Sequence, residues 1–397
     1  MRIAFIEQES QLGGVEYTTL RVAQGLDKSK FDPVIICPAE GNLPLLARQA
    51  GLEVQIVPRP KFTSVSFIWG KHTIANPFGF LLTAMSVIHV VGNLYKYFQV
   101  NPVDFVITKG LLAHFYGGMA ARQLNIPCIW YIQEEVDKNR GAGLFRFILN
   151  KGAQRIPAKI VVDANALLEQ FDKLSDVSAT VQVIYNGIDT QQFCPFSQQE
   201  KQNARNRLNI PSNAMVIGQA GRIIPIKGQA TLLDAFVRLA QDFPEVHLLF
   251  VGAPLFGNVA YEQKLRARAI QAGLESRVHF SGFLPDVRYG LAAMDIFVHA
   301  SVETDSPVSV LEAMSCGLPI VVSSVRGTVE MVIPNVDALV FEPGNSDVLV
   351  LMLNKLIKSP YMQQELGKNA RAAVIQKFSL QASIKQLESV IQEVYAG

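Results

Sequence analysis

The stretch Val298–Ser323, VHASVETDSPVSVLEAMSCGLPIVVS, carries the strongest local signals in the chain. Two apolar, strand-like runs, Asp295–Ala300 and Ile320–Val322, flank a segment that we predict to be helical over Val308–Cys316. A strand that leads into the N-terminus of a buried helix favours an anion there, because free backbone N–H groups and the helix dipole both attract negative charge. The stretch therefore predicts an α/β unit with a phosphate site at the start of this helix.

The ends of the predicted helix carry residues with strong capping preferences. Ser306 suits the N-cap and Pro307 the first helical position, while Gly317 suits the residue that follows the last turn. We expect Ser306, Pro307 and Val308, at the start of the helix, to line the phosphate site.

Glu312 lies inside this predicted helix, between Leu311 and Ala313. A carboxylate in apolar surroundings is costly unless it has a partner, and sugar hydroxyls are suitable partners. The alternative is a glutamate on a solvated helix face, and this stretch alone does not distinguish the two.

The run Glu312–Pro319, EAMSCGLP, resembles the signature of the family-four retaining glycosyltransferases, which have the GT-B fold. The resemblance implies that Glu312 binds the nucleotide ribose and that an earlier acidic residue holds the donor sugar. Thr304 stands where the family pattern has that acid, and its neighbours are Glu303 and Asp305. Asp305 is nearer the helix N-terminus, where its charge would stabilise the helix. We therefore assign the donor-sugar contact to Glu303, whose side chain has the longer reach, with Asp305 as the alternative.

The size and composition of the chain exclude several classes of protein. A chain of 397 residues is too long for one ordinary core, and its net charge of +2 gives no support to nucleic-acid binding. The four cysteines have no close pair, which indicates neither a zinc site nor a disulfide framework and suits a reducing, cytoplasmic compartment. The N-terminal MRIAFIEQES is typical of a buried first strand and differs from a secretory signal.

Alternating strands and helices in both halves predict two parallel sheets with helices on both faces. The family resemblance implies that these are the two Rossmann-like domains of a GT-B fold, which face each other across a cleft. We predict an N-terminal, acceptor-side domain over residues 1–188, a linker over 189–213, and a C-terminal nucleotide-sugar-binding domain over 214–379. The family resemblance implies that the last helix, at about 380–397, packs back on the first domain. The strands expected in the first half are Ile3–Ile6, Val34–Cys37, Val54–Val57, Asp104–Thr108, Cys128–Ile132 and Ile160–Asp163.

A glycine turn follows the first expected strand. Gly13 and Gly14 allow a backbone to come close to a ligand, although a tight turn alone also needs glycine. The run Gly13-Gly14-Val15-Glu16 resembles the glycine loop of the family, which implies that Gly14 contacts the donor.

The segment Phe78–Phe98, FGFLLTAMSVIHVVGNLYKYF, is unusually apolar, and Lys96 is its only formal charge. Gly92 and Asn93 interrupt it, so we expect a helix that is buried against the sheet or lies on a membrane surface, in preference to a membrane span.

The strand Cys128–Ile132 leads into Gln133-Glu134-Glu135. Ligands bind beyond the carboxyl ends of strands in open parallel sheets, so these polar residues are candidates for substrate contact. The family often has a histidine before an acid here. Gln133 cannot carry a proton, so an acid or base role passes to Glu134 or Glu135; loop residues without a function are the alternative.

In the second half, the strand Met215–Ala220 is followed by the glycine-bounded loop GRIIPIKG, which opens a helix. Arg222 and Lys227 in this loop are suited to a diphosphate, and the run matches the Gly-Arg and Lys-Gly pattern of the family. Gly252 follows the next strand, at a turn where a base or ribose commonly passes. His279 and His299 lie at strands without triad-like neighbours, and we expect them to be structural.

Taken with the resemblance, these motifs predict a cytoplasmic retaining glycosyltransferase that moves a sugar from a nucleotide diphosphate donor to a polysaccharide, lipid or small-molecule acceptor. No metal or further cofactor is expected, because Arg222, Lys227 and helix N–H groups can replace a divalent ion. Two alternatives remain, a nucleotide-sugar epimerase of similar architecture and a non-catalytic donor-binding protein.

Overall fold

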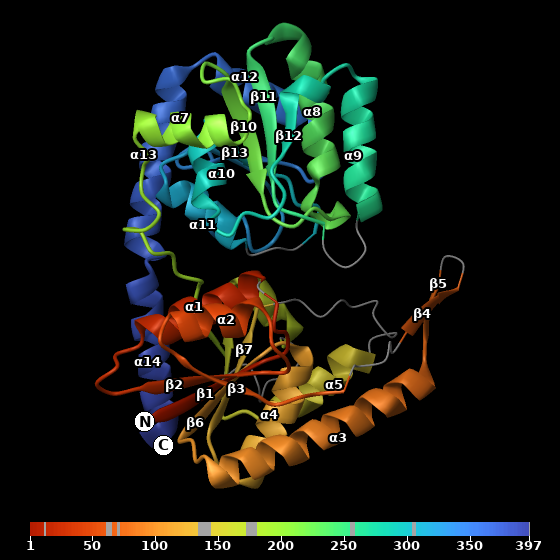
Figure 1. The fold of residues 1–397 in the computed structure, drawn as a ribbon, viewed down its shortest axis with the longest axis vertical. Helices are drawn as coiled ribbons and strands as arrows, with labels where there is room; N and C mark the ends of the chain where they lie inside the picture. The colour runs from red at the N-terminus through yellow and green to blue at the C-terminus, as the bar shows by residue number, and fades with distance from the viewer. Residues whose placement is uncertain are drawn as a thin grey trace. The chain divides into compact units, whose positions relative to one another are not determined.

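A computed structural model describes residues 1–11, 13–60, 66–69, 72–133, 144–171, 181–254, 259–303 and 307–396. The chain divides into two compact units (Figure 1). The first unit consists of Met1–Asn186 with Leu380–Gly397, and the second of Gly187–Ser379. Each unit is an α/β structure built on one parallel sheet, so the predicted fold class of two Rossmann-like domains is confirmed.

The first unit is built on a seven-stranded sheet in the order β3-β2-β1-β6-β7-β8-β9, in which every pairing is parallel. The strands are β1 (Arg2–Glu7), β2 (Asp32–Cys37), β3 (Glu53–Ile56), β6 (Phe105–Lys109), β7 (Cys128–Ile132), β8 (Lys159–Val162) and β9 (Val181–Val183). The chain order reverses between β1 and β6, where Glu7 pairs with Lys109. Ligands of doubly wound sheets bind at such a reversal, beyond the carboxyl ends of the strands.

Helices cover both faces of this sheet (Figure 1). They are α1 (Gly14–Gly25), α2 (Asn42–Gln49) and α14 (Leu380–Ala396) on one face, and α3 (Pro77–Val100), α4 (Leu111–Gln123) and α5 (Leu144–Ala153) on the other. Because strand side chains alternate, Ile3 and Phe5 of β1 pack with the first group, and Ala4 and Ile6 with the second. The sequence prediction omitted α5 and an antiparallel hairpin, β4 (Ser66–Trp69) with β5 (His72–Ala75). A 3-10 helix, Asn165–Gln170, follows β8.

Helix α3 has two different halves. Its C-terminal half is buried in the core of the first unit, through residues such as Val90 and Leu94. Its N-terminal half exposes Phe78, Leu81 and Met85. Of the helices within the described ranges, only α3 contains a segment long and apolar enough to cross a membrane, by length and composition alone.

The second unit is built on a six-stranded sheet in the order β12-β11-β10-β13-β14-β15, again with every pairing parallel. The strands are β10 (Met215–Ala220), β11 (Val246–Val251), β12 (Val278–Phe280), β13 (Ile296–His299), β14 (Ile320–Ser323) and β15 (Leu339–Phe341). The chain order reverses between β10 and β13, so the loops after these two strands meet at the reversal.

Helices α8, α9 and α12 share one apolar core with this sheet, and α10, α11 and α13 contact its strands β10 and β14. The helices of the unit are α7 (Gln198–Arg207), α8 (Gln229–Asp242), α9 (Val259–Gln271), α10 (Arg288–Ala293), α11 (Val308–Ser315), α12 (Ser346–Ile357) and α13 (Pro360–Lys377). Two 3-10 turns accompany them, Pro225–Lys227 and Glu275–Arg277.

Residues 189–213, which we expected to be a linker, are part of the second unit. Helix α7 in this segment is fastened by Arg205, whose guanidinium donates to the Ala293 carbonyl at 3.1 Å and to Asp295 Oδ2 at 2.6 Å. Asp295 Oδ2 also accepts the Val216 N–H at 2.8 Å, at the start of β10. The polar composition of this segment belongs to one solvated helix, which a nearly buried arginine holds in place.

Candidate functional site

The loop after β10 is fixed to the end of β13, its neighbour at the chain reversal. The Val302 N–H and the Ser301 hydroxyl both donate to the Ile226 carbonyl at 2.9 Å. Gly228 has a φ of 66°, and a Cβ atom there would lie 1.8 Å from the Ala300 carbonyl oxygen. Only glycine permits this contact, so the second glycine of the loop is required by the backbone.

Arg222 and Lys227 lie in this fixed loop. Arg222 is exposed and Lys227 is half-buried. Their carbonyl oxygens accept hydrogen bonds from Gln229 Nε2 at 2.8 Å and Gln219 Nε2 at 2.7 Å, respectively. These hydrogen bonds fix the backbone of the loop. Arg222 and Lys227 therefore lie at the point where the strand order of the sheet reverses, and their charges there would attract an anionic ligand.

Glu312 is buried, with 7% of its surface exposed, on the short helix α11. This burial excludes the solvated helix face that the sequence left open. The helix ends as predicted, because Gly317 has a φ of 73° and the N–H groups of Gly317 and Leu318 donate to the Met314 and Ala313 carbonyls.

The start of α11 differs from the prediction by one residue. Pro307 has φ −79° and ψ 117°, so it is the N-cap and Val308 is the first helical residue. Because its ψ is extended, Pro307 cannot be the first helical residue, and it takes the N-cap position itself. Asp305 and Ser306 lie outside the described residues, and Glu303 is exposed.

Gly252 has a structural reason to be glycine. Its φ is 136°, and a Cβ atom there would lie 2.0 Å from the Gly221 carbonyl oxygen. Its N–H donates to the Gly282 carbonyl at 3.1 Å, which ties the ends of β11 and β12 together. The turn thus brings the backbone after β11 against the loop that carries Arg222.

In the first unit, the glycine turn lies between β1 and α1. Glu16 Oε2 accepts the Gly13 N–H at 2.9 Å at the helix start. A Cβ atom at Gly14 would meet nothing within 4 Å, and Gly14 has no positive φ. Within the described residues, neither packing nor backbone conformation requires a glycine at this position.

A row of polar residues, of which the sequence reasoning identified only Gln133 as a candidate for substrate contact, lies at the carboxyl ends of five adjacent strands of the first unit. Its members are Glu7, Lys109, Gln133, Asp163 and Asn186. All are buried except Gln133, which is half-buried. The signal was present in the sequence, because three of them directly end apolar strands, in the runs FIE, ITK and VVD. Glu134, to which we assigned an acid or base role, lies outside the described residues.

Burial perturbs the ionisation of this row. It raises the pKa of Asp163 to about 7, against hydrogen bonds from Asn186 and Gln133 that lower it. Burial also raises the pKa of Glu7 and lowers that of Lys109, although the two opposite charges partly offset this effect.

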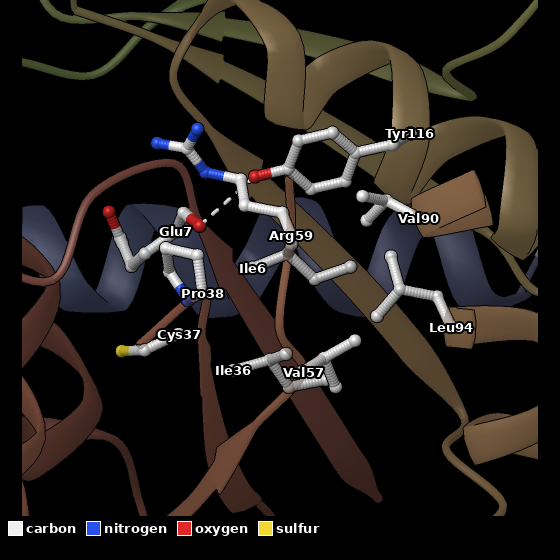
Figure 2. Close-up of a pocket in the computed structure, with 10 residues that line it drawn as sticks. All are labelled: Ile6, Glu7, Ile36, Cys37, Pro38, Val57, Arg59, Val90, Leu94 and Tyr116. Atoms are coloured by element: carbon white, nitrogen blue, oxygen red, sulfur yellow. Dashed lines mark hydrogen bonds between the residues drawn. The ribbon is translucent and has the colours of Figure 1, made fainter. Parts of the chain in front are cut away.

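A small, mostly apolar pocket adjoins Glu7 and is lined in part by residues of α3 and α4 (Figure 2). There the hydroxyl of Tyr116 donates to the Glu7 carbonyl at 3.1 Å.

The histidines have structural partners. His247 Nδ1 and His279 Nε2 are 2.9 Å apart on neighbouring strands, with stacked rings. Burial lowers the pKa of His247 to about 4. His299 is buried at the end of β13. In the part of the chain that the structure describes, no group of three or more His, Cys, Asp or Glu side chains could hold a metal ion.

Two family models match the chain in order. The model described as Glycosyltransferase Family 4 matches residues 12–192, and the model described as Glycosyl transferases group 1 matches residues 200–373. The first match lies almost wholly in the first unit and the second lies in the second unit.

Individual relatives and solved structures agree with these matches. A GDP-mannose-dependent monoacylated alpha-(1-6)-phosphatidylinositol monomannoside mannosyltransferase of Corynebacterium glutamicum is 28% identical over 57% of this chain and 59% of its own length. An Escherichia coli UDP-Gal:alpha-D-GlcNAc-diphosphoundecaprenol alpha-1,3-galactosyltransferase is 23% identical over 98% of this chain and 96% of its own. The match therefore spans less than two thirds of the first relative and nearly all of the second.

Among solved structures, Anabaena Alr3699/HepE in complex with UDP-glucose superimposes with a TM-score of 0.83 at 25% identity, over 99% of this chain and 100% of that one. WaaG, a glycosyltransferase involved in lipopolysaccharide biosynthesis, has a TM-score of 0.73 at 18% identity over 98% of this chain and 99% of its own, and shows likeness of fold only. With both of its units matched in order, the chain belongs to the family-four glycosyltransferases and has their GT-B fold.

Proposed function

We propose that this protein transfers a sugar from a UDP-linked donor to a glycan or lipid-linked acceptor, with retention at the anomeric carbon and without a divalent metal. The observation that carries the proposal is the pair of cations, Arg222 and Lys227, on a loop fixed at the chain reversal of the second sheet. When a glycosidic bond to a diphosphate breaks, negative charge grows on the leaving group. A guanidinium fork and an ammonium beside it would stabilise that charge in place of a metal ion.

The choice of UDP rests on two comparisons. HepE, at 25% identity over nearly the whole chain, binds UDP and UDP-glucose. The E. coli relative, of which the match covers 96%, uses UDP-Gal. The mannosyltransferase that depends on GDP-mannose matches over only 59% of its length. Retention is carried over from the family resemblance, in which Glu312 holds the ribose and Glu303 or Asp305 the sugar.

The decisive experiment is UDP binding measured by calorimetry in excess chelator. Arg222→Ala and Lys227→Ala should each weaken binding by roughly ten- to a hundredfold, because each removes a charge-assisted contact of about 1.5–3 kcal/mol. Lys355→Ala, on the exposed side of α12 in the same unit, is the matched control and should bind as the parent does. Unchanged affinity in both loop variants would remove the phosphate assignment.

Turnover then separates the transferase from its alternatives. With UDP-glucose and no acceptor, an epimerase would yield a second nucleotide sugar, whereas a transferase would yield slow hydrolysis at most. If the protein binds UDP-glucose but converts it neither in the absence of an acceptor nor in the presence of a lipid or glycan extract, it is a donor-binding relative. The transfer proposal would then be wrong.

We also propose that the first unit lies peripherally on the cytoplasmic face of an anionic membrane through α3. Phe78, Leu81, Met85 and Ile88 recur at helical spacing and are 68%, 56%, 59% and 65% exposed. Between Glu53 and Asp104 the sequence has no acidic residue and four cations, Arg59, Lys61, Lys71 and Lys96. An apolar stripe among cations suits the surface of an anionic bilayer.

Surface binding fits α3 better than a span does. Val90, Val91, Leu94 and Phe98 belong to the core of the first unit, so a membrane-spanning α3 would uncover that core. A cytoplasmic location is supported by the four cysteines, all of which are free. The names of the two relatives specify lipid-linked acceptors, a phosphatidylinositol mannoside and a diphosphoundecaprenol sugar, which a membrane-bound enzyme could reach.

A further inference from the structure

Four of the buried polar side chains at the carboxyl edge of the first sheet have an atom without a hydrogen-bond partner among the described residues. These atoms are Glu7 Oε2, Lys109 Nζ, Gln133 Oε1 and Asp163 Oδ1. A buried polar atom without a partner has lost its hydrogen bonds to water and gained none in return, so four in one row are unfavourable for a purely structural arrangement. They lie where open parallel sheets bind ligands, which would supply the missing partners.

The hydrogen bonds within this row have a fixed direction. Asn186 Nδ2 donates to Asp163 Oδ2 at 2.7 Å, and Gln133 Nε2 donates to Asn186 Oδ1 at 2.8 Å. Above about pH 7, where Asp163 is ionised, its carboxylate can only accept, so Asn186 turns its NH2 group toward Asp163 and its oxygen toward Gln133. Gln133 must then turn its NH2 group toward Asn186. Its carbonyl oxygen, Oε1, is left facing away from the chain of hydrogen bonds.

The charges around this row favour a neutral ligand. Lys109 lies over the ring of Tyr131, with its Nζ 4.5 Å from the ring centroid, and interacts with the carboxyl groups of Glu7 and Asp163. One cation between two acids leaves no excess positive charge to hold a phosphate. A hydroxyl group can donate to Gln133 Oε1 and also accept a hydrogen bond, which matches a row of mixed donors and acceptors.

We propose that Gln133 binds a sugar hydroxyl through its Oε1 atom, and that Asp163 and Asn186 are positioning residues that fix the direction of its amide. This inference rests on the proposed function, because it takes the ligand to be the sugar of the donor or of the acceptor. It gives a binding role to Gln133, whose amide cannot act as an acid or base. It also explains why a buried carboxyl and a buried amide stand behind that residue.

Three variants test the inference, with Gln123→Met at the exposed end of α4 as the matched control. Gln133→Met removes the acceptor oxygen at similar volume. Asp163→Asn can donate as well as accept, so the amide of Gln133 is free to turn. The exchange variant Asp163→Asn/Asn186→Asp moves the carboxylate to position 186, where it again accepts from the NH2 group of Gln133. The direction of Oε1 should therefore be restored.

Two assays distinguish the donor sugar from the acceptor sugar. If the hydroxyl belongs to the donor, Gln133→Met should bind UDP-glucose roughly tenfold more weakly and bind UDP as the parent does, as expected for one lost hydrogen bond. If it belongs to the acceptor, hydrolysis of UDP-glucose should be unchanged, and transfer of radiolabelled glucose to a lipid extract should fall roughly tenfold in kcat/KM. In whichever of these two assays Gln133→Met is impaired, Asp163→Asn should be impaired less than Gln133→Met. The exchange variant should approach the value of the parent.

The inference is overturned if Gln133→Met retains both activities, or if the exchange variant is no better than Asp163→Asn alone. Melting temperatures of all variants control for misfolding, and unchanged UDP affinity shows that the second unit is intact. A parent protein that binds no UDP would instead overturn the proposed function. These outcomes are distinguishable because UDP binding is assigned to residues of the other unit.

Discussion

Glu312 is a carboxylate held at 7% exposure within one short helix, and its proposed partner is a ribose. Glu312→Gln replaces two acceptor oxygens by one, so we expect UDP affinity to fall by up to about tenfold, the effect of one hydrogen bond. The measurement is calorimetry with UDP and with a deoxyribose analogue. The analogue should bind the parent and the variant more nearly alike. Equal discrimination between the two nucleotides by both proteins would show that Glu312 does not contact the ribose.

Asp163 makes a pH-dependent contribution to stability. Burial raises its pKa from the ordinary 3.8 to about 7, and the charged group that faces it is Lys109, which lowers this pKa. Between about pH 4 and pH 7 the folded state holds a proton that the unfolded chain has released. The contribution is therefore fully present below about pH 4 and is lost as the pH rises through 7.

Asp163→Asn removes this titration. The free energy of unfolding of the variant, relative to the parent, should rise with pH across that window by at most about 1.4 kcal/mol per pH unit. Urea denaturation at a series of pH values is the measurement. A difference that does not change with pH would mean that the carboxyl group titrates normally in the folded protein.

Single residues were predicted from the sequence where chemistry and position coincide. The end of α11 at Gly317 agrees with the prediction, whereas the binding roles of Glu312 and Arg222 stay predictions. The roles of Glu7, Lys109 and Asp163 were missed because a polar residue at the end of a strand is usually solvated, and only the packed structure reveals that these are buried.

Helix α3 provides a test at the scale of one element. Met85→Glu places a charge in the middle of the exposed apolar stripe, and Gln99→Glu places the same charge at the other end of the helix. Burying a methionine side chain contributes about 1.5–3 kcal/mol, so Met85→Glu should weaken binding to phosphatidylglycerol vesicles by at least about tenfold, and Gln99→Glu much less.

Vesicle sedimentation measures this binding, with neutral phosphatidylcholine vesicles as the comparison. Equal binding of the parent and Met85→Glu would contradict a membrane role for the stripe. Concentration-dependent dimers that Met85→Glu dissociates would assign the stripe to a second copy of this chain instead.

Elements with a strong repeating pattern were predicted well, and short or polar ones were not. The strands from β1 to β8 that belong to the sheet agree with the sequence to within about two residues. The β4–β5 hairpin was missed because each strand has only four residues and no alternating pattern. Helix α7 was assigned to a linker because its sequence is polar. Only the structure shows that Arg205 anchors it to Asp295 of the second unit.

For the whole molecule, the sequence predicted two parallel-sheet units because strand and helix patterns alternate in both halves. It could not reveal which chain segments share a core, since contacts between distant segments leave no local pattern. The residues proposed to bind UDP lie in the second unit, so UDP should protect amide hydrogens from exchange in that unit. UDP should slow amide hydrogen exchange at the carboxyl ends of β10 and β13 and in α11, and leave β1 and β6 unchanged. Protection spread equally over both units would contradict a nucleotide site built by the second unit alone.

Helix α14 completes the core of the first unit, where Ile384, Leu387 and Ile391 pack with Ile3 and Phe5. During synthesis, the ribosome makes this helix only after every residue of the second unit. At about 5–20 residues per second, the intervening Gly187–Ser379 takes on the order of ten to forty seconds. Throughout that interval one face of the nascent first sheet lacks the part of its cover that α14 supplies, whereas the second unit has its whole chain available as soon as it emerges. The domain that is translated first must therefore finish folding last, and until then it is a natural client for a chaperone.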